Sequence, residues 1–178
     1  MKGIVYNLLE VCVSREYGED MWDDLLAAAG VDGAYTSVGS YPDEDLFALV
    51  AAASEALGKP PNSIIRWFGC SAMPLLAGQY PSFFEPHTST RAFALTLNGI
   101  IHPEVRKLYP GADVPTFNFD GSTDDLLVMG YWSPRRLCAF AEGLLQGAAH
   151  HYGEQIVIEQ PQCMLRDDAR CVLEISLR

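Results

Sequence analysis

The spacing of apolar residues changes along this chain, and the change restricts the class of fold. Helical spacing dominates the first hundred residues. One predicted helix carries Leu46, Val50, Ala53 and Leu57, with Pro42 near its start and Gly58 at its end. A second begins near Pro61 and carries Ile64, Ile65, Phe68, Ala72 and Leu76. Pro74 should kink or shorten this second helix.

A further helical stretch runs from about Thr90 to Gly99, just before His102. Pro103 follows this histidine, and a proline biases the residue before it away from helical backbone angles. We therefore expect His102 at a helix kink or a helix start.

Residues beyond about 110 predict strands as well as a helix. Segments 116–119 and 124–131 predict two strands joined by a turn at Asp120-Gly121, and segments 155–159 and 171–176 predict another pair. Between the pairs lies a long amphipathic helix with Leu137, Phe140, Ala141, Leu144, Leu145 and Ala148 on one face. The prediction is an α+β fold in one domain, residues 1–178. Its helical part (about 1–110) packs on a part with an antiparallel sheet and helices (about 111–178), with a ligand between them.

The net charge and the distribution of apolar residues limit which partners the protein can bind and where in the cell we expect it. The formal net charge of −11 disfavours nucleic acid and anionic membranes, because binding phosphates needs clustered cations. The acidity suits solubility, or a docking surface for a basic partner. No run approaches the roughly 20 apolar residues of a membrane span, and Glu10 follows the start too soon for a secretory signal. We therefore expect a soluble cytoplasmic protein.

The most informative polar residues are His102 and, about thirty residues later, Tyr131, Ser133 and Arg135 at alternate positions. A neutral imidazole can ligate haem iron. Side chains two apart on extended chain point the same way, so the three could hold paired carboxylates together. Each also has an ordinary interpretation. His102 could be a core or surface histidine, Tyr131 a half-buried strand residue, Ser133 a helix N-cap, and Arg135 the partner of a nearby acid.

The Tyr-x-Ser-x-Arg spacing, the segment from Ile101 to Pro110 and the opening Met1-Lys2-Gly3 together resemble the H-NOX (haem-nitric oxide/oxygen binding) family. The family is related to the sensor domain of soluble guanylate cyclase, and the resemblance covers the whole chain. It implies a haem b group between the two parts of the domain, with His102 as the axial iron ligand. Tyr131, Ser133 and Arg135 would hold the haem propionates. Pro115, Val5 and Leu144 would bend the porphyrin out of plane.

The same resemblance assigns a distal pocket, in which oxygen-binding members place a tyrosine five residues after the motif arginine. Here that position is Phe140, and the other lining positions read Leu9, Ala72, Leu76 and Leu144. None of these side chains is a hydrogen-bond donor, which bound oxygen needs and nitric oxide needs much less. The resemblance and this chemistry imply a nitric oxide sensor that excludes oxygen. All five would equally serve as ordinary core residues.

The resemblance also implies a mechanism and partners. Nitric oxide, or carbon monoxide, would bind ferrous haem, and nitric oxide would break the Fe–His102 bond. The two parts of the domain would then shift, and a histidine kinase or a cyclic-di-GMP enzyme would read the new shape. We do not expect an enzyme, because no nucleophile–base pair stands out.

Five cysteines remain to be explained. Cys12 and Cys70 lie in apolar stretches and suit a core. Some bacterial H-NOX proteins bind zinc through three cysteines and a histidine, and Cys138, Cys163 and Cys171 match those cysteines. Gln160 stands where the histidine would be, whereas structural zinc prefers four protein ligands. Zinc, reduced core thiols and a redox switch are the alternatives. A cysteine- or zinc-based redox-sensing module is therefore the second functional hypothesis.

Overall fold

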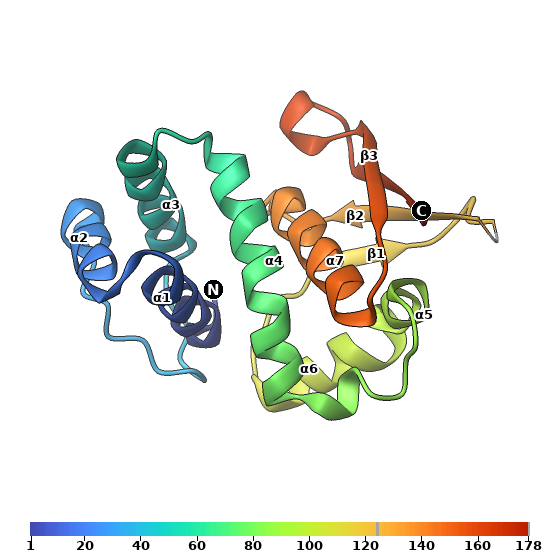
Figure 1. Cartoon of the computed structure of the whole chain (residues 1–178), viewed down its shortest axis with the longest axis horizontal. Coiled ribbons are helices and arrows are strands. Elements are labelled where there is room, and N and C mark those ends of the chain that lie inside the picture. The colour runs from blue at the N-terminus through green and yellow to red at the C-terminus, as the bar shows by residue number, and fades with distance from the viewer. Residues whose placement is uncertain (124, 178) are drawn as a thin grey trace.

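A computed structural model describes residues 1–123 and 125–177. The helices are α1 (Gly3–Tyr17), α2 (Glu19–Ala29), α3 (Asp43–Leu57), α4 (Pro61–Gln79), α5 (Thr90–Leu95), α6 (His102–Leu108) and α7 (Cys138–Tyr152). Short turns of other helix types are η1 (Pro81–Phe83), η2 (Leu97–Ile101) and η3 (Met164–Arg166). In Figure 1, α1, α2 and α3 gather at one end and the sheet lies at the other, with α4 and α7 between them. The predicted α+β class is confirmed.

Two of the helix signals act as expected, and a third does not shorten its helix. Pro42 precedes α3, and Gly58 ends it with a left-handed φ of 61°. Pro74 does not shorten α4, which continues to Gln79. The helix packs along α7 over much of its length, and this packing offsets the hydrogen bond that proline removes.

Glycines allow α4 and α7 to cross at close range. A Cβ atom added at Gly143 would lie 2.0 Å from the carbonyl oxygen of Arg66, and one at Gly69 would lie 2.5 Å from that of Phe140. Neither backbone can move away without separating the helices. The two glycines thus set the distance between the helices, and α7 carries part of the cavity wall described below.

The sheet is antiparallel and has the order β1-β2-β4-β3, from β1 (Thr116–Asn118), β2 (Leu126–Trp132), β3 (Ile156–Gln162) and β4 (Cys171–Leu177). Both predicted strand pairs are confirmed, although position 124 lies outside the described residues. The central pairing of β2 with β4 joins the two hairpins. Along β4, Cys171, Leu173 and Ile175 are buried while their neighbours are half-buried, so one face of the sheet packs against the core.

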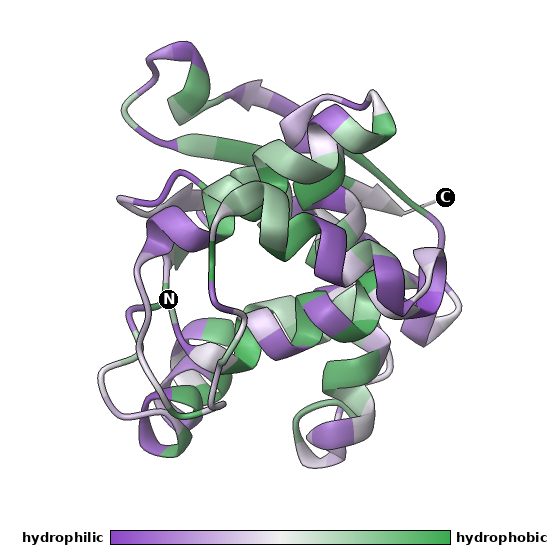
Figure 2. Cartoon of the chain, turned by 90° about the vertical axis from the view of Figure 1, so that its left-hand side faces the viewer, coloured by the Kyte–Doolittle hydropathy of each residue, from purple (hydrophilic) through white to green (hydrophobic). Residues whose placement is uncertain are grey.

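The packing units do not divide at residue 110. One cluster of buried residues belongs mainly to α1–α4, and a second joins the sheet, α7 and Ala94 of α5. The segment from α5 to α6 follows α4 in sequence but lies under the sheet and α7 (Figure 1). Figure 2 shows hydrophobic residues on the facing sides of these layers and hydrophilic ones on the outer turns.

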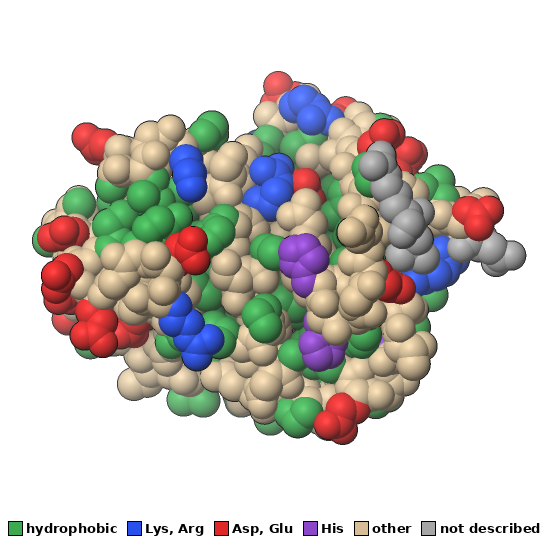
Figure 3. Space-filling model, viewed as in Figure 1, with side chains coloured by type: hydrophobic (Ala, Val, Ile, Leu, Met, Phe, Trp, Pro, Cys, Tyr) green, Lys and Arg blue, Asp and Glu red, His purple; other side chains and the backbone are tan. Residues whose placement is uncertain are grey.

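The acidic charge is concentrated at the helical end of the molecule. Asp and Glu side chains gather there over α2 and α3 (Figure 3), including Glu19, Asp20, Glu44 and Asp45 in the first turns of these helices. These positions suit helix N-termini, where negative charge is stabilised by the helix dipole. Within the described residues, no helix is both long enough and apolar enough to cross a membrane.

Candidate functional site

A cavity of about 440 Å³ lies between the two parts of the molecule. This volume falls within the roughly 300–1,000 Å³ of cofactor and ligand sites. Its walls come from α1, α4, α6, α7, the sheet and the segment before β1, and most of them are apolar. Polar groups gather in one region, where Tyr131, Ser133, Arg135 and Asp113 reach the lining.

His102 lines this cavity at the start of α6. Its backbone angles, φ −64° and ψ −38°, are those of an α-helix, so the expected departure from helical geometry at His102 was wrong. The departure lies in η2, whose wider π-helical turn immediately precedes it. Pro103 has no N–H to donate to Gly99 and would crowd its carbonyl, and the wider turn accommodates this. The predicted helix start at His102 is confirmed.

The environment of His102 keeps its ring neutral. Burial, with a smaller contribution from the charge of Arg106, lowers the pKa of His102 to about 4. Its ring stacks on that of Phe117 at 5.4 Å between centroids. Phe117 pairs across the sheet with Tyr131, so the three rings follow one another along the cavity wall. A neutral imidazole with a free lone pair is the form that ligates a metal ion.

Tyr131 and Ser133 are held by β2 and by the turn that follows it. Burial raises the pKa of the Tyr131 hydroxyl to about 12, so it stays a hydrogen-bond donor at neutral pH. Ser133 is 4% exposed, and its Oγ accepts a hydrogen bond from the backbone N–H of Arg135 at 3.3 Å. Because α7 begins only at Cys138, Ser133 does not cap it, and that interpretation was wrong.

Arg135 does pair with nearby acids, as its ordinary interpretation expected. Its Nε donates to Oδ2 of Asp43 at 2.7 Å, and its Nη1 donates to Oδ2 of Asp113 at 3.0 Å. Nη1 also donates to the backbone oxygen of Asp113. A guanidinium has five N–H donors, and its Nη2 makes no hydrogen bond to the described residues. Arg135 can thus bind a further carboxylate without leaving its partners.

The cavity contains most of the predicted lining residues, but not all. Val5, Leu76, Pro115, Phe140 and Leu144 line it. Leu9 and Ala72 do not, and both are buried in the core of the α1–α4 part. Their neighbours Leu8 and Met73 line the cavity in their place. One position along a helix turns a side chain by about 100°, so a shift of one residue in the alignment exchanges lining for core.

Sequence reasoning missed two cavity residues with hydroxyl groups. Tyr80, at the end of α4, and Tyr109, at the end of α6, both line the cavity, and their hydroxyls are hydrogen-bonded to each other. Burial first, and then the Tyr80 hydroxyl, raises the pKa of Tyr109 above its ordinary range. Tyr109 is in the segment that resembled the family, but its partner is 29 residues away in sequence. No local pattern marks such a pair.

The sequence of residues 2–160 matches the family model described as Haem-NO-binding. The chain belongs to the H-NOX family. Two H-NOX structures from Shewanella oneidensis match it over 100% of this chain and 99% of theirs. The protein in its Fe(II)NO state is 32% identical with a TM-score of 0.94, and the domain in its Fe(II)CO state is 33% identical with a TM-score of 0.91.

An oxygen-binding H-NOX domain, solved as its oxygen complex, shares the fold at a TM-score of 0.84. It is 23% identical, and the match covers 100% of this chain and 95% of that one. H-NOX structures thus include complexes of nitric oxide, carbon monoxide and oxygen. Membership of the family alone does not select the gas, and the lining of the individual cavity has to be considered.

The residues of this H-NOX cavity fit a haem group. His102 offers a neutral imidazole within the largely apolar cavity. Tyr131, Ser133 and Arg135 supply hydroxyl and guanidinium donors for anionic carboxylates in the same cavity. These residues would hold haem by iron ligation at His102 and by hydrogen bonds to the propionates. A group with an apolar body and two acidic arms matches both regions of the lining.

The three late cysteines form a cluster apart from the lining of the H-NOX cavity. Cys138 begins α7, Cys163 follows β3 and Cys171 begins β4, and all three are buried. Their sulfur atoms lie within 4.8 Å of one another. No other His, Cys, Asp or Glu among residues 1–123 and 125–177 joins the group. The four-ligand arrangement of structural zinc is therefore not formed by the described residues.

Proposed function

We propose that the protein is a haem-based nitric oxide sensor that excludes oxygen. The observation that carries this proposal is the apolar character of the cavity walls from α1, α4 and α7. These helices line the cavity with Ile4, Val5, Leu8, Met73, Leu76, Phe140, Ala141, Leu144 and Leu145. None of these side chains can donate a hydrogen bond.

This lining discriminates between the gases by charge. Oxygen bound to ferrous iron carries partial negative charge and is stabilised by a nearby donor in a dry site. Nitric oxide carries little such charge and binds well against apolar side chains. Phe140, whose ring stacks on Phe68 at 4.9 Å between centroids, occupies the wall where a tyrosine would supply the donor. The nitric oxide complex of the S. oneidensis relative supports the same assignment.

Signal transmission would begin at His102. Haem b, when bound, would supply a ferrous iron able to bind nitric oxide or carbon monoxide. His102 would hold that iron and would be free to move if it were released. The neighbouring η2 is a π-helical turn, a geometry that is often found at functional sites. A shift of α6 would change the surface that the protein presents. A partner with different affinities for the two shapes would sense the gas.

The partner in this proposal is a histidine kinase or a cyclic-di-GMP enzyme, and the sensor itself has no catalytic activity. A cytoplasmic location, expected from the sequence, belongs to the same proposal. The thiol-based alternative is weaker as a sensing mechanism, because reactive cysteines are exposed and have low pKa values. Here Cys138, Cys163 and Cys171 are buried, and burial raises the pKa of Cys138 and, to about 12, that of Cys171.

Absorption spectroscopy of the reduced, haem-loaded protein tests the proposal. We expect a five-coordinate ferrous spectrum, a change on adding nitric oxide, and no stable oxygen complex in air. The His102→Gly variant should lose the proximal ligand and recover it with added imidazole. His150→Ala is the matched control, because His150 is exposed on α7 and outside the cavity lining.

Two results would contradict this function. An unchanged spectrum in His102→Gly would remove His102 from the iron. A stable oxygen complex of the wild-type protein would reveal a donor, and Tyr80→Phe would then show whether the Tyr80–Tyr109 pair supplies it. If no haem were bound at all, the sensor proposal would fail entirely.

A further inference from the structure

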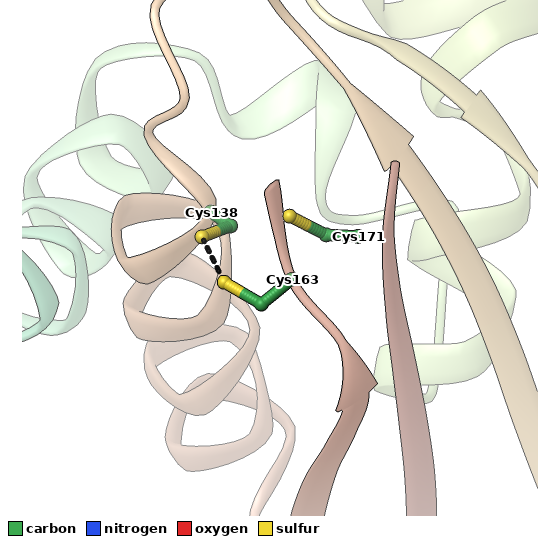
Figure 4. A group of neighbouring side chains, drawn as sticks. All are labelled: Cys138, Cys163 and Cys171. Carbon is green, nitrogen blue, oxygen red and sulfur yellow. Dashed lines mark hydrogen bonds between the residues drawn. The ribbon is translucent and has the colours of Figure 1, made fainter. Parts of the chain in front are cut away.

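The cluster of Cys138, Cys163 and Cys171 has the dimensions of a three-thiolate metal site. Figure 4 shows the three side chains coming from different elements, with the sulfurs of Cys138 and Cys163 in contact and the sulfur of Cys171 beside them. The sulfurs of Cys138 and Cys163 are 3.7 Å apart, and all three lie within 4.8 Å of one another. With metal–sulfur bonds of about 2.3 Å, three sulfurs at 120° around one ion lie about 4.0 Å apart. Small side-chain rotations would reach that geometry.

Nearby polar residues do not complete a fourth position. His150 and His151 belong to the opposite end of α7, roughly 18 Å from Cys138 at 1.5 Å per residue. The carboxylate of Asp168 already has a partner, because its Oδ2 accepts a hydrogen bond from the backbone N–H of Cys163 at 2.7 Å. The cysteines are at most 4% exposed, which leaves little access for a water ligand from solvent. An ion bound here would have three ligands, all sulfur.

Burial disfavours negative charge on these sulfurs, and nearby polar groups offset part of that cost. The backbone N–H of Met164 donates to the sulfur of Cys171 at 3.2 Å. Cys138 lies in the first turn of α7, where the helix dipole favours an anion. The Gln160 side chain lies near the Cys138 sulfur, and its Nε2 atom is buried and makes no hydrogen bond to the described residues. A thiolate at Cys138 would give this amide nitrogen an acceptor.

We propose that Cys138, Cys163 and Cys171 form a three-coordinate site for a soft monovalent cation, Cu(I), and that Gln160 stabilises it by donating a hydrogen bond to a thiolate. Thiolates select soft ions such as Cu(I) and zinc. Zinc prefers four protein ligands, whereas the softer, singly charged Cu(I) can be held by three thiolates. Gln160 acts here as a hydrogen-bond donor and takes no part as a ligand. The site therefore favours Cu(I) over zinc, because it supplies three ligands and not four.

Competition between the haem-loaded protein and the chelator bicinchoninate, with Cu(I) added anaerobically as its acetonitrile complex, tests this site. We expect one Cu(I) per chain, three sulfur neighbours by X-ray absorption, and an unchanged haem spectrum. Cys163→Ser should weaken Cu(I) binding at least a hundredfold. Cys12→Ser is the control, because Cys12 is a buried thiol of α1 outside the cluster.

The Gln160→His variant tests whether the number of ligands decides which metal binds, and it leaves every thiol in place. A histidine there would add a fourth ligand, so the affinity for Zn²⁺ should rise at least tenfold over that of the wild-type protein. Four protein donors around Zn²⁺ in the wild-type protein, or Cu(I) binding that survives Cys163→Ser, would overturn the proposal. If Cys163→Ser failed to fold, fewer than three sulfur neighbours around Cu(I) in the wild-type protein would still refute it.

Discussion

Arg135 donates its Nε hydrogen to Oδ2 of Asp43 over 2.7 Å, and this ion pair joins the turn after β2 to the first residue of α3. Oδ1 of the same carboxylate accepts a hydrogen bond of 2.6 Å from the amino group of Met1. Asp43 therefore connects two cationic groups that both belong to residues of the cavity lining. It positions Arg135 from outside the Tyr-x-Ser-x-Arg spacing.

Replacing Asp43 with Asn should loosen Arg135. The change removes the charge and leaves the guanidinium, only 17% exposed, without its main partner. Hydrogen bonds to charged groups contribute about 1.5–3 kcal/mol, so we expect a loss of about 1–3 kcal/mol in unfolding free energy and faster haem dissociation. Urea titration and haem transfer to apomyoglobin measure these two effects. Glu44→Gln, in the same turn, is the control and should change neither; equal losses in both variants would refute the positioning role.

The Asp43 ion pairs also predict how stability depends on pH. Burial raises the pKa of Asp43, but hydrogen bonds from the Met1 amino group and Arg135 outweigh it and hold this pKa below its ordinary value of 3.8. A carboxylate whose pKa is lower in the folded protein stabilises above its unfolded pKa, and loses that effect as the pH falls through the folded one.

The stability difference between wild-type and Asp43→Asn proteins should accordingly be constant near neutral pH and shrink below about pH 4. Urea unfolding at a series of pH values, followed by circular dichroism, measures it. A difference that stayed constant down to pH 3 would show that Asp43 does not contribute through its charge.

Gly143→Ala should force α4 and α7 apart. The new Cβ would lie 2.0 Å from a backbone oxygen of α4, and overpacking of this kind costs typically 1–3 kcal/mol or more. Because α7 carries Phe140 and Leu144, we also expect a changed haem spectrum. Gly78→Ala is the matched control within α4, since nothing lies within 4 Å of its added Cβ. That variant should be neutral or more stable by up to about 1 kcal/mol, and a destabilisation equal to that of Gly143→Ala would argue against close helix contact as the cause.

Replacing Phe140 with Tyr should make the haem-loaded protein bind oxygen more tightly. A phenol at this position would bring a donor to a wall that is otherwise apolar, and one hydrogen bond contributes about 0.5–1.5 kcal/mol. We expect oxygen dissociation to slow by about tenfold, measured by stopped-flow spectroscopy. Phe140→Leu keeps the wall apolar and should show no such slowing. Identical behaviour of the two variants would mean that Phe140 does not face the bound gas.

Local pattern was sufficient for much of this fold. The helical period before residue 100, the two hairpins and the α7 helix were predicted from neighbouring residues, because each depends on burial of one face of a single element. Expectations failed where a neighbour in space decides the outcome. Pro74 does not shorten α4, which packs on α7, and Ser133 lies in a turn that delays the start of α7 until Cys138.

The residues of the candidate site also fall into two groups: those that the sequence could identify and those that only the structure reveals. His102, Tyr131, Ser133 and Arg135 could be selected from their types and spacing, and the structure places all four on one cavity. Leu9 and Ala72 were selected by alignment and lie in the core, because one residue of register along a helix turns the side chain by about 100°, away from the cavity. The Tyr80–Tyr109 pair escaped notice, since its partners meet only after α4 and α6 have folded together.

The sequence by itself determined the class of fold and selected the histidine, the three polar side chains and the cysteines as candidates, because these depend on residue chemistry and local periodicity. Only the tertiary structure decided which side chains line the cavity, that Asp43 holds Arg135, and that three cysteines from α7, β4 and the segment after β3 converge without a fourth ligand. Those relationships join residues far apart along the chain. They follow from the packing of whole elements, which no local pattern encodes.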